Sequence, residues 1–91
     1  MRFEWDDKKS RLNHKKHGVR FDEAKTVFCD PLTLTVFDSD HSDAECRFLD
    51  IGRSDQGRLL VVAYTERGRN VRLISARLAL PSERKQYEEA G

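Results

Sequence analysis

Three charged side chains in the second half of the chain have the chemistry to hold and cut a phosphodiester. Glu66 and Arg67 stand side by side in the segment 64–68, and Arg77 follows in the next segment. Fixed guanidinium groups can bind a phosphate and stabilise charge that develops on it, and a carboxylate can accept a proton. The structural alternative is a cross-strand Glu–Arg pair worth about 0.2–1 kcal/mol, and spacing alone favours that alternative.

Other side chains suited to this chemistry lie outside that segment. His17, next to Lys16, can act as an acid or a base near neutral pH, although an imidazole that caps a helix is at least as common at such a position. Tyr64 and Tyr87 could stack on a base, but a tyrosine on a strand or a final helix is more often packed in the core. The remaining candidates for contacts with RNA are Arg72 and Arg84.

A β-hairpin must position the central residues. The apolar run 59–64 predicts a buried strand, Gly68 marks a turn, and residues 71–79 predict the return strand. With a two-residue loop, Arg67 faces Asn70, and Glu66 and Arg77 share one side of the hairpin. With a three-residue loop, Arg67 joins Arg77 instead. The sequence does not choose between these registers.

The rest of the chain supplies helices and further strands. Asp6 is a good N-cap and Gly18 a good C-cap for a helix over 7–17, in which Asn13 is expected to be a buried hydrogen-bonding residue. Glu83 is placed to reach back to the free amide of Leu80 at the start of a last helix. The other predicted elements are strands at 3–5, 32–38 and 47–52, a helix over 22–28, a polar loop from Ser39 to Glu45, and the last helix over 81–87.

This order of elements predicts one α+β domain over residues 1–91, with N-terminal helices packed on an antiparallel sheet in two layers. The formal net charge is only +1, but basic residues gather in 1–20 and 66–77 and acidic residues in 38–55. No apolar run is long enough to span a membrane and no secretory pattern begins the chain, so we expect a cytoplasmic protein. Cys29 and Cys46 lack metal-ligand spacing, and we predict no metal and no cofactor.

The chain also resembles a known family along nearly its whole length. The resemblance is carried, in order and with fitting spacing, by Phe3-Glu4-Trp5-Asp6, Asn13, Lys16-His17-Gly18-Val19, Phe21, Glu23-Ala24, Phe28, Asp30-Pro31, Arg47, Ile51-Gly52, Tyr64-Thr65-Glu66-Arg67, Ser75-Ala76-Arg77, Glu83-Arg84 and Tyr87. These residues are similar to those of the BrnT toxins of bacterial type II toxin–antitoxin systems. Leu80 departs from the pattern, because related chains usually have a capping Ser or Thr there.

The resemblance implies a RelE-like fold and a ribonuclease that needs no metal and inhibits translation by cutting RNA. It also implies a BrnA-like antitoxin, a toxin homodimer within a toxin–antitoxin heterotetramer, and operator DNA bound only through the antitoxin. By position, Glu66, Arg67 and Arg77 would form the catalytic group, with His17, Lys16 and Tyr87 as weaker candidates.

Two other functions compete with the ribonuclease. A catalytically inactive protein-binding or corepressor module, acting only through the antitoxin, fits the modest net charge. A stand-alone DNA-binding repressor is the weakest alternative, because the sequence has no helix-turn-helix or ribbon pattern with a basic reading surface.

Overall fold

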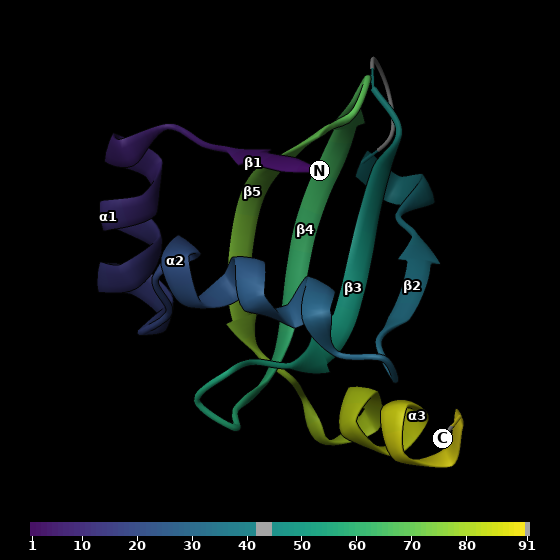
Figure 1. Cartoon of the computed structure of the whole chain (residues 1–91). Coiled ribbons are helices and arrows are strands. Elements are labelled where there is room, and N and C mark those ends of the chain that lie inside the picture. Colours follow the sequence, from purple (N-terminus) through teal and green to yellow (C-terminus); the bar gives the residue numbers. More distant parts are fainter. Residues whose placement is uncertain (42–44, 91) are drawn as a thin grey trace.

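In the computed structural model of this chain, five strands form one sheet in the order β1-β5-β4-β3-β2 (Figure 1). The structure describes residues 1–41 and 45–90, so part of the predicted loop from Ser39 to Glu45 lies outside the described residues. The strands are β1 (Arg2–Glu4), β2 (Leu34–Phe37), β3 (Arg47–Arg53), β4 (Leu59–Arg67) and β5 (Asn70–Leu78). The helices are α1 (Asp7–His17), α2 (Phe21–Ala24) and α3 (Pro81–Ala90), with 3₁₀ turns η1 (Lys25–Cys29) and η2 (Ser39–His41).

The sheet confirms the predicted α+β class and corrects one part of its topology. β2 to β5 form the expected antiparallel meander. β1, however, pairs in parallel with the first half of β5, from Arg2 opposite Asn70 to Glu4 opposite Arg72. The sheet is therefore mixed, and β1 leaves the second half of β5 without a neighbouring strand on that side.

Both predicted caps of α1 are present. The Asp6 carboxylate accepts hydrogen bonds from the amides of Lys8 and Lys9, and Gly18 adopts the left-handed conformation at φ +72° that ends the helix. The predicted second helix begins at Phe21 and tightens into the 3₁₀ turn η1 from Lys25.

Gly52 lets η1 and the chain that follows it lie close against β3. A Cβ atom at Gly52 would stand 2.5 Å from Thr33 Oγ1 and 2.7 Å from Val27 Cγ1. The hydroxyl of Thr33 in turn donates to the carbonyl oxygen of Val27 at 2.9 Å. Any larger residue at this position would push the 3₁₀ turn away from the sheet.

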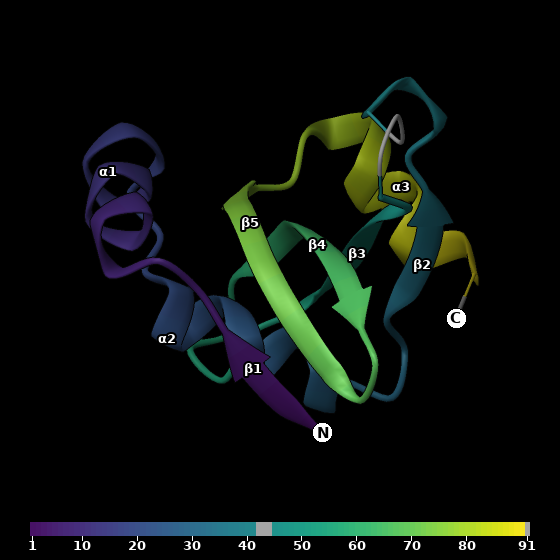
Figure 2. The ribbon, with the colours of Figure 1, turned by 90° about the horizontal axis from the view of Figure 1, so that it is seen from above.

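The two faces of the sheet are covered differently (Figure 2). One face packs against α2 and η1 through a core that includes Phe21, Val27 and Leu60. The opposite face meets α3 only at one end, where Tyr87 packs on Val61 and its neighbours. The expected two layers are thus joined by a partial third layer. We call the second face the open face; it carries Glu4, Thr65, Arg67, Arg72, Ser75 and Arg77.

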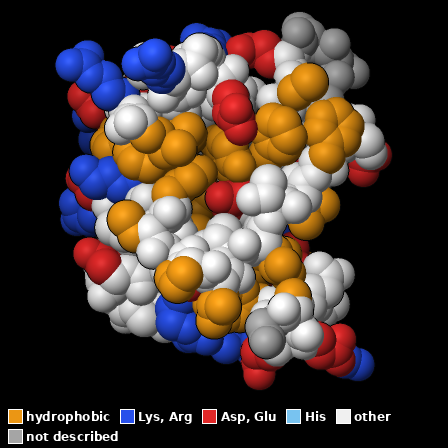
Figure 3. Space-filling view, turned by 45° about the vertical axis from the view of Figure 1, so that its right-hand side comes forward, with side chains coloured by type: hydrophobic (Ala, Val, Ile, Leu, Met, Phe, Trp, Pro, Cys, Tyr) orange, Lys and Arg blue, Asp and Glu red, His pale blue; other side chains and the backbone are white. Residues whose placement is uncertain are grey.

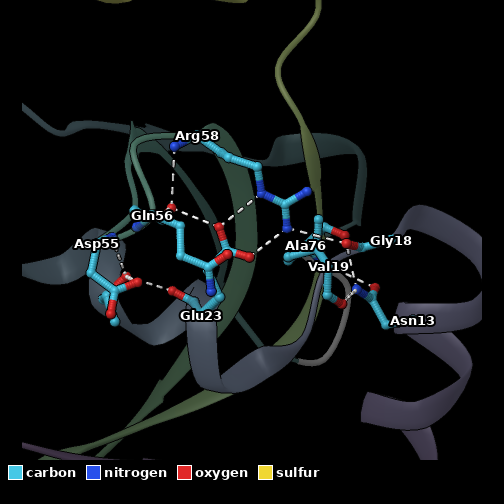
Figure 4. A network of polar contacts seen from close by, with 10 residues as sticks. Asn13, Gly18, Val19, Glu23, Asp55, Gln56, Arg58 and Ala76 are labelled. Carbon is cyan, nitrogen blue, oxygen red and sulfur yellow. Dashed lines mark hydrogen bonds and ion pairs between the residues drawn. The ribbon is translucent and has the colours of Figure 1, made fainter.

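A partly buried ion pair fastens α2 to the end of the sheet and to α1 (Figure 4). Arg58 donates through Nε and Nη2 to the carboxylate of Glu23, which is only 5% exposed. Ser54 donates to the same carboxylate at 2.7 Å, and a guanidinium nitrogen of Arg58 also reaches the carbonyl oxygen of Gly18 at 3.1 Å. The hydrogen bonds from Arg58 lower the pKa of Glu23, more than burial raises it. The network holds the C-terminus of α1 beside the sheet.

Candidate functional site

The β4–β5 hairpin has the two-residue loop, with Arg67 opposite Asn70 and Gly68 at φ +61° in the turn. The pairing then shifts, because Ala63 faces Ser75 while Tyr64 faces Leu73, so Ile74 is an extra residue in β5. This bulge changes which side chains share a face. Arg77 pairs with Val61 and so lies on the open face with Arg67.

Two arginines of the hairpin approach a single carboxylate oxygen at the turn end of the open face. Nη1 of Arg67 lies 3.9 Å from Oε1 of Glu4, and Nη1 of Arg72 lies 3.8 Å from that same oxygen. Arg67 also holds Glu45 with two hydrogen bonds, from Nε at 3.1 Å and from Nη2 at 3.0 Å. The hydrogen bond from Arg67 lowers the pKa of Glu45. We call Arg67 and Arg72 the arginine pair; Glu4 is the carboxylate that both approach.

Thr65 adds a hydroxyl to this end of the open face. It stands between Arg47 on β3 and Arg72 on β5 in the strand register and is 4% exposed. Its Oγ1 is buried and has no hydrogen-bond partner among residues 1–41 and 45–90. Buried hydroxyls without partners are uncommon, and such groups are one mark of functional sites.

Arg77 is not part of this cluster, although it lies on the same face. Its guanidinium forms two hydrogen bonds with Glu83 of α3, at 2.7 and 2.8 Å, and this contact raises the pKa of Arg77. The register places it opposite Val61, six residues from Arg67 on β4 and thus about 20 Å along the strand. The expectation that Arg67 and Arg77 converge on one anionic pocket is therefore corrected: each has its own carboxylate.

Glu66 and Tyr64 lie on the other face of β4, because side chains alternate along a strand. Glu66 is exposed there, opposite Val71, and is not directed to the arginine pair. Tyr64 is only 5% exposed, and its ring packs edge-on against Phe28. The expectation that Tyr64 stacks on RNA is corrected, because its ring is enclosed in the core.

The hydroxyl of Tyr64 forms a hydrogen bond with Asp50, a buried carboxylate that the sequence analysis did not identify as a candidate. Tyr64 and Thr35 both donate to Oδ1 of Asp50, at 2.9 and 2.8 Å, and Asp50 is 4% exposed. Burial raises the pKa of Asp50, and the two hydrogen bonds offset this only in part. A signal was present, because Asp50 shares with Phe48 and Gly52 the covered face of β3.

The remaining predicted residues lie elsewhere. His17 and Lys16 are in the last turn of α1 and line a groove beside Ser75. Arg84 is exposed on α3. Tyr87 is 7% exposed, and its hydroxyl donates to Asp30 at 2.5 Å, so its ring is largely unavailable to a base.

The side of the molecule around β2 offers a different surface (Figure 3). Hydrophobic side chains form a band across this view, while Lys and Arg lie mainly at its margins. Phe37 at the sheet edge is 51% exposed. A phosphate-binding surface is thus better sought on the open face than here.

No metal site or membrane span emerges from the described part of the chain. Within residues 1–41 and 45–90, no three His, Cys, Asp or Glu side chains cluster as ligands. Cys29 and Cys46 are both free and exposed. None of the described helices is long and apolar enough to cross a bilayer.

Comparison with known proteins shows which family and which solved structure this chain is similar to. Residues 5–83 match the family described as "Ribonuclease toxin, BrnT, of type II toxin-antitoxin system". The fold is similar to the crystal structure of the Brucella abortus ribonuclease toxin BrnT, with a TM-score of 0.67 and 23% sequence identity, covering 88% of this chain and 97% of that chain. A comparison with curated proteins gives no match.

Proposed function

This chain belongs to the BrnT family of ribonuclease toxins of type II toxin–antitoxin systems, and we propose that it is itself an endoribonuclease that cuts RNA without a metal ion. Inhibition of translation would follow from the loss of intact RNA. The arginine pair, Arg67 and Arg72, would bind the phosphate that is cut.

The observation that carries this proposal is the position of Glu4. One of its oxygens lies within 4 Å of guanidinium nitrogens from both Arg67 and Arg72. Two cations from neighbouring positions of a hairpin can therefore face one anionic oxygen. A phosphate that displaced Glu4 would meet the same two guanidinium groups, which can each donate more than one hydrogen bond to it.

The reaction suited to such a site is attack by the neighbouring 2′-hydroxyl on the phosphorus. The 2′-hydroxyl loses its proton as its oxygen forms a bond to phosphorus, and the bond to the 5′-oxygen breaks as that oxygen gains a proton. The products therefore end in a 2′,3′-cyclic phosphate and a 5′-hydroxyl. The five-coordinate transition state carries additional negative charge on its non-bridging oxygens. Arg67 and Arg72 would stabilise this charge more strongly than the charge of the ground state. Acid and base roles for Glu66 and His17 stay predictions, and neither side chain lies at the arginine pair.

A type II system supplies a protein antitoxin, and we include in the proposal a BrnA-like partner that covers the active surface. The toxin would dimerise within a heterotetramer and reach operator DNA only through that partner, in the cytoplasm. The open face supports this arrangement, because α3 covers only one end of it.

One observation favours the alternative of an inactive binding module. Arg67 is held by Glu45 and Arg77 by Glu83, so these cations already have partners within the chain. In a module that only binds its antitoxin, such pairs would remain in place.

Cleavage of RNA by the purified chain in the presence of a chelator separates the two functions. We expect wild-type protein to cut RNA, and Arg67→Ala or Arg72→Ala to slow cleavage about 100- to 1000-fold. Arg69→Ala is the matched control, because Arg69 is an exposed arginine in the turn of the same hairpin. Absence of cleavage by wild-type protein, or equal loss in the Arg69 variant, would contradict the proposal.

A further inference from the structure

A groove runs between α1 and the second half of β5. Its lining includes Lys9, Leu12, Lys16, His17, Ile74 and Ser75. The groove exists because β1 pairs only with residues 70–72 of β5, so that α1 rather than a strand lies beside the rest of β5. The Asn13 side chain takes the place of that missing strand by binding both backbone groups of Ala76 (Figure 4).

The basic side chains along this groove take part in none of the ion pairs formed within residues 1–41 and 45–90. Among the described residues, no carboxylate forms an ion pair with Lys9, Lys16 or His17. The nearest acidic influence is at Asp6, whose pKa is lowered by hydrogen bonds from the amides of Lys9 and Lys8 and, less strongly, by the charge of Lys9. The groove differs from the hairpin, where Arg67, Arg72 and Arg77 all contact carboxylates. The ammonium groups of Lys9 and Lys16 are therefore available to an external anion.

The groove also has an apolar component. Leu12 is 60% exposed although it lies between the two lysines on the helix, and the half-buried Ile74 at the bulge of β5 lines the same groove. Cations beside exposed apolar side chains fit a nucleotide, which presents a phosphate and an apolar base or ribose edge together. A free phosphate would use only the cations.

The groove opens onto the open face that carries the arginine pair. Ser75, which lines the groove, faces Ala63 in the register and lies on the same face as Thr65 and Arg72. Arg72 and Ser75 are three residues apart on β5, which is about 10 Å. Figure 2 shows α1 beside the β5 edge and α3 on the far side of this face, so one strand of RNA could follow β5 from the hairpin turn to α1.

We propose that the groove between α1 and β5 binds the backbone of the same single RNA strand whose scissile phosphate is held by Arg67 and Arg72. Lys9 and Lys16 are two helical turns apart, about 10 Å along the axis, and so contact separate phosphates. This proposal rests on the proposed function for the identity of its ligand. It assigns the groove to affinity and positioning rather than to the chemical step.

The test measures affinity for a short single-stranded RNA in which every 2′-hydroxyl is methylated, so that it binds but cannot be cut. With both Lys9 and Lys16 replaced by Ala, we expect weaker binding and a slope of log affinity against log salt that is smaller by about 1.4, the value for two lost phosphate contacts on a single strand. Lys8→Ala with Lys15→Ala is the matched control. These lysines have the same spacing and charge on the same helix but do not line the groove.

The outcomes separate the groove from the proposed function. An equal loss of RNA affinity in both double variants would show general electrostatic attraction and would overturn the proposal that the groove binds RNA. Unchanged RNA binding with weaker binding of the antitoxin would assign the groove to that partner and overturn it as well. If the RNA binds through Lys9 and Lys16 but unmodified RNA is never cut, the groove stands and the ribonuclease proposal fails.

Discussion

At the scale of single residues, Asn13 determines how α1 meets the sheet. Its side-chain amide donates to the carbonyl oxygens of Val19 and Ala76, both at 2.9 Å, and its Oδ1 accepts from the Ala76 amide at 3.1 Å. All of these groups are buried. Backbone groups that would otherwise lack partners at the edge of β5 are thus satisfied by one side chain.

We predict that Asn13→Ala lowers the free energy of unfolding by about 3 kcal/mol, because it leaves buried backbone donors and acceptors unpaired. Asn13→Asp should be at least as damaging, since a carboxylate cannot donate to the two carbonyl oxygens and would carry a buried charge. Urea denaturation of both variants gives the measurement, with Ser10→Ala on the same helix as the control. Stability equal to wild type in both Asn13 variants would show that the amide is not needed.

Contacts between residues close together in the sequence could be predicted, whereas contacts between distant residues could not. The hydrogen bond from the Leu80 amide to Glu83, at 2.8 Å, follows from a spacing of three residues and was predicted. Burial of Asn13 was predicted too, but not its partner Ala76. The approach of Glu4 to Arg72 could not be predicted, because it follows from the parallel pairing of the first strand with the last.

At the scale of elements, Asp50 links three strands. It lies on β3 and accepts hydrogen bonds from Thr35 of β2 and Tyr64 of β4. Its raised pKa means that the folded chain holds this proton at a higher pH than the unfolded chain does, where the ordinary value is 3.8. As the pH rises from that value through the raised pKa, the folded state loses stability, because the buried carboxyl becomes charged.

Asp50→Asn should therefore raise the free energy of unfolding at neutral pH. An asparagine keeps the oxygen that accepts both hydrogen bonds and removes the buried charge. The gain should shrink as the pH is lowered towards the ordinary carboxyl pKa of 3.8, because the wild-type side chain then becomes neutral as well. Urea denaturation across this pH range measures it, and Asp40→Asn is the control because Asp40 is exposed. A less stable Asp50→Asn protein at neutral pH would contradict this account.

The elements themselves were largely predictable, and the exceptions have physical causes. Caps and periodicity indicated α1, the meander and α3, since these signals are local. The bulge at Ile74 was not predicted, because the residues of β5 carry no pattern that marks an extra residue, which becomes visible only in the pairing of β5 with β4. That one extra residue moved Arg77 to the face of Arg67.

At the scale of the whole molecule, α3 limits how much of the open face is accessible. Tyr87 packs on this face with Val61, and Arg77 fixes the first turn of α3 through Glu83. Arg77 thus stabilises the position of α3, a structural role that its neighbours in the sequence did not indicate. A comparison of variants at Arg77 and at Glu83 tests whether Arg77 also contacts RNA.

We expect Arg77→Ala and Glu83→Gln to behave alike. Each should lower stability by about 1 kcal/mol, or about 4–8 °C in Tm for a domain of this size, because each removes the same two-pronged ion pair. Both should leave RNA cleavage close to wild type at a temperature where the chain is folded. In cells that express the chain without an antitoxin, both should still arrest growth, whereas Arg67→Ala should not. If Arg77→Ala alone abolishes cleavage and toxicity while Glu83→Gln keeps both, then Arg77 acts on RNA and its catalytic assignment from sequence is right.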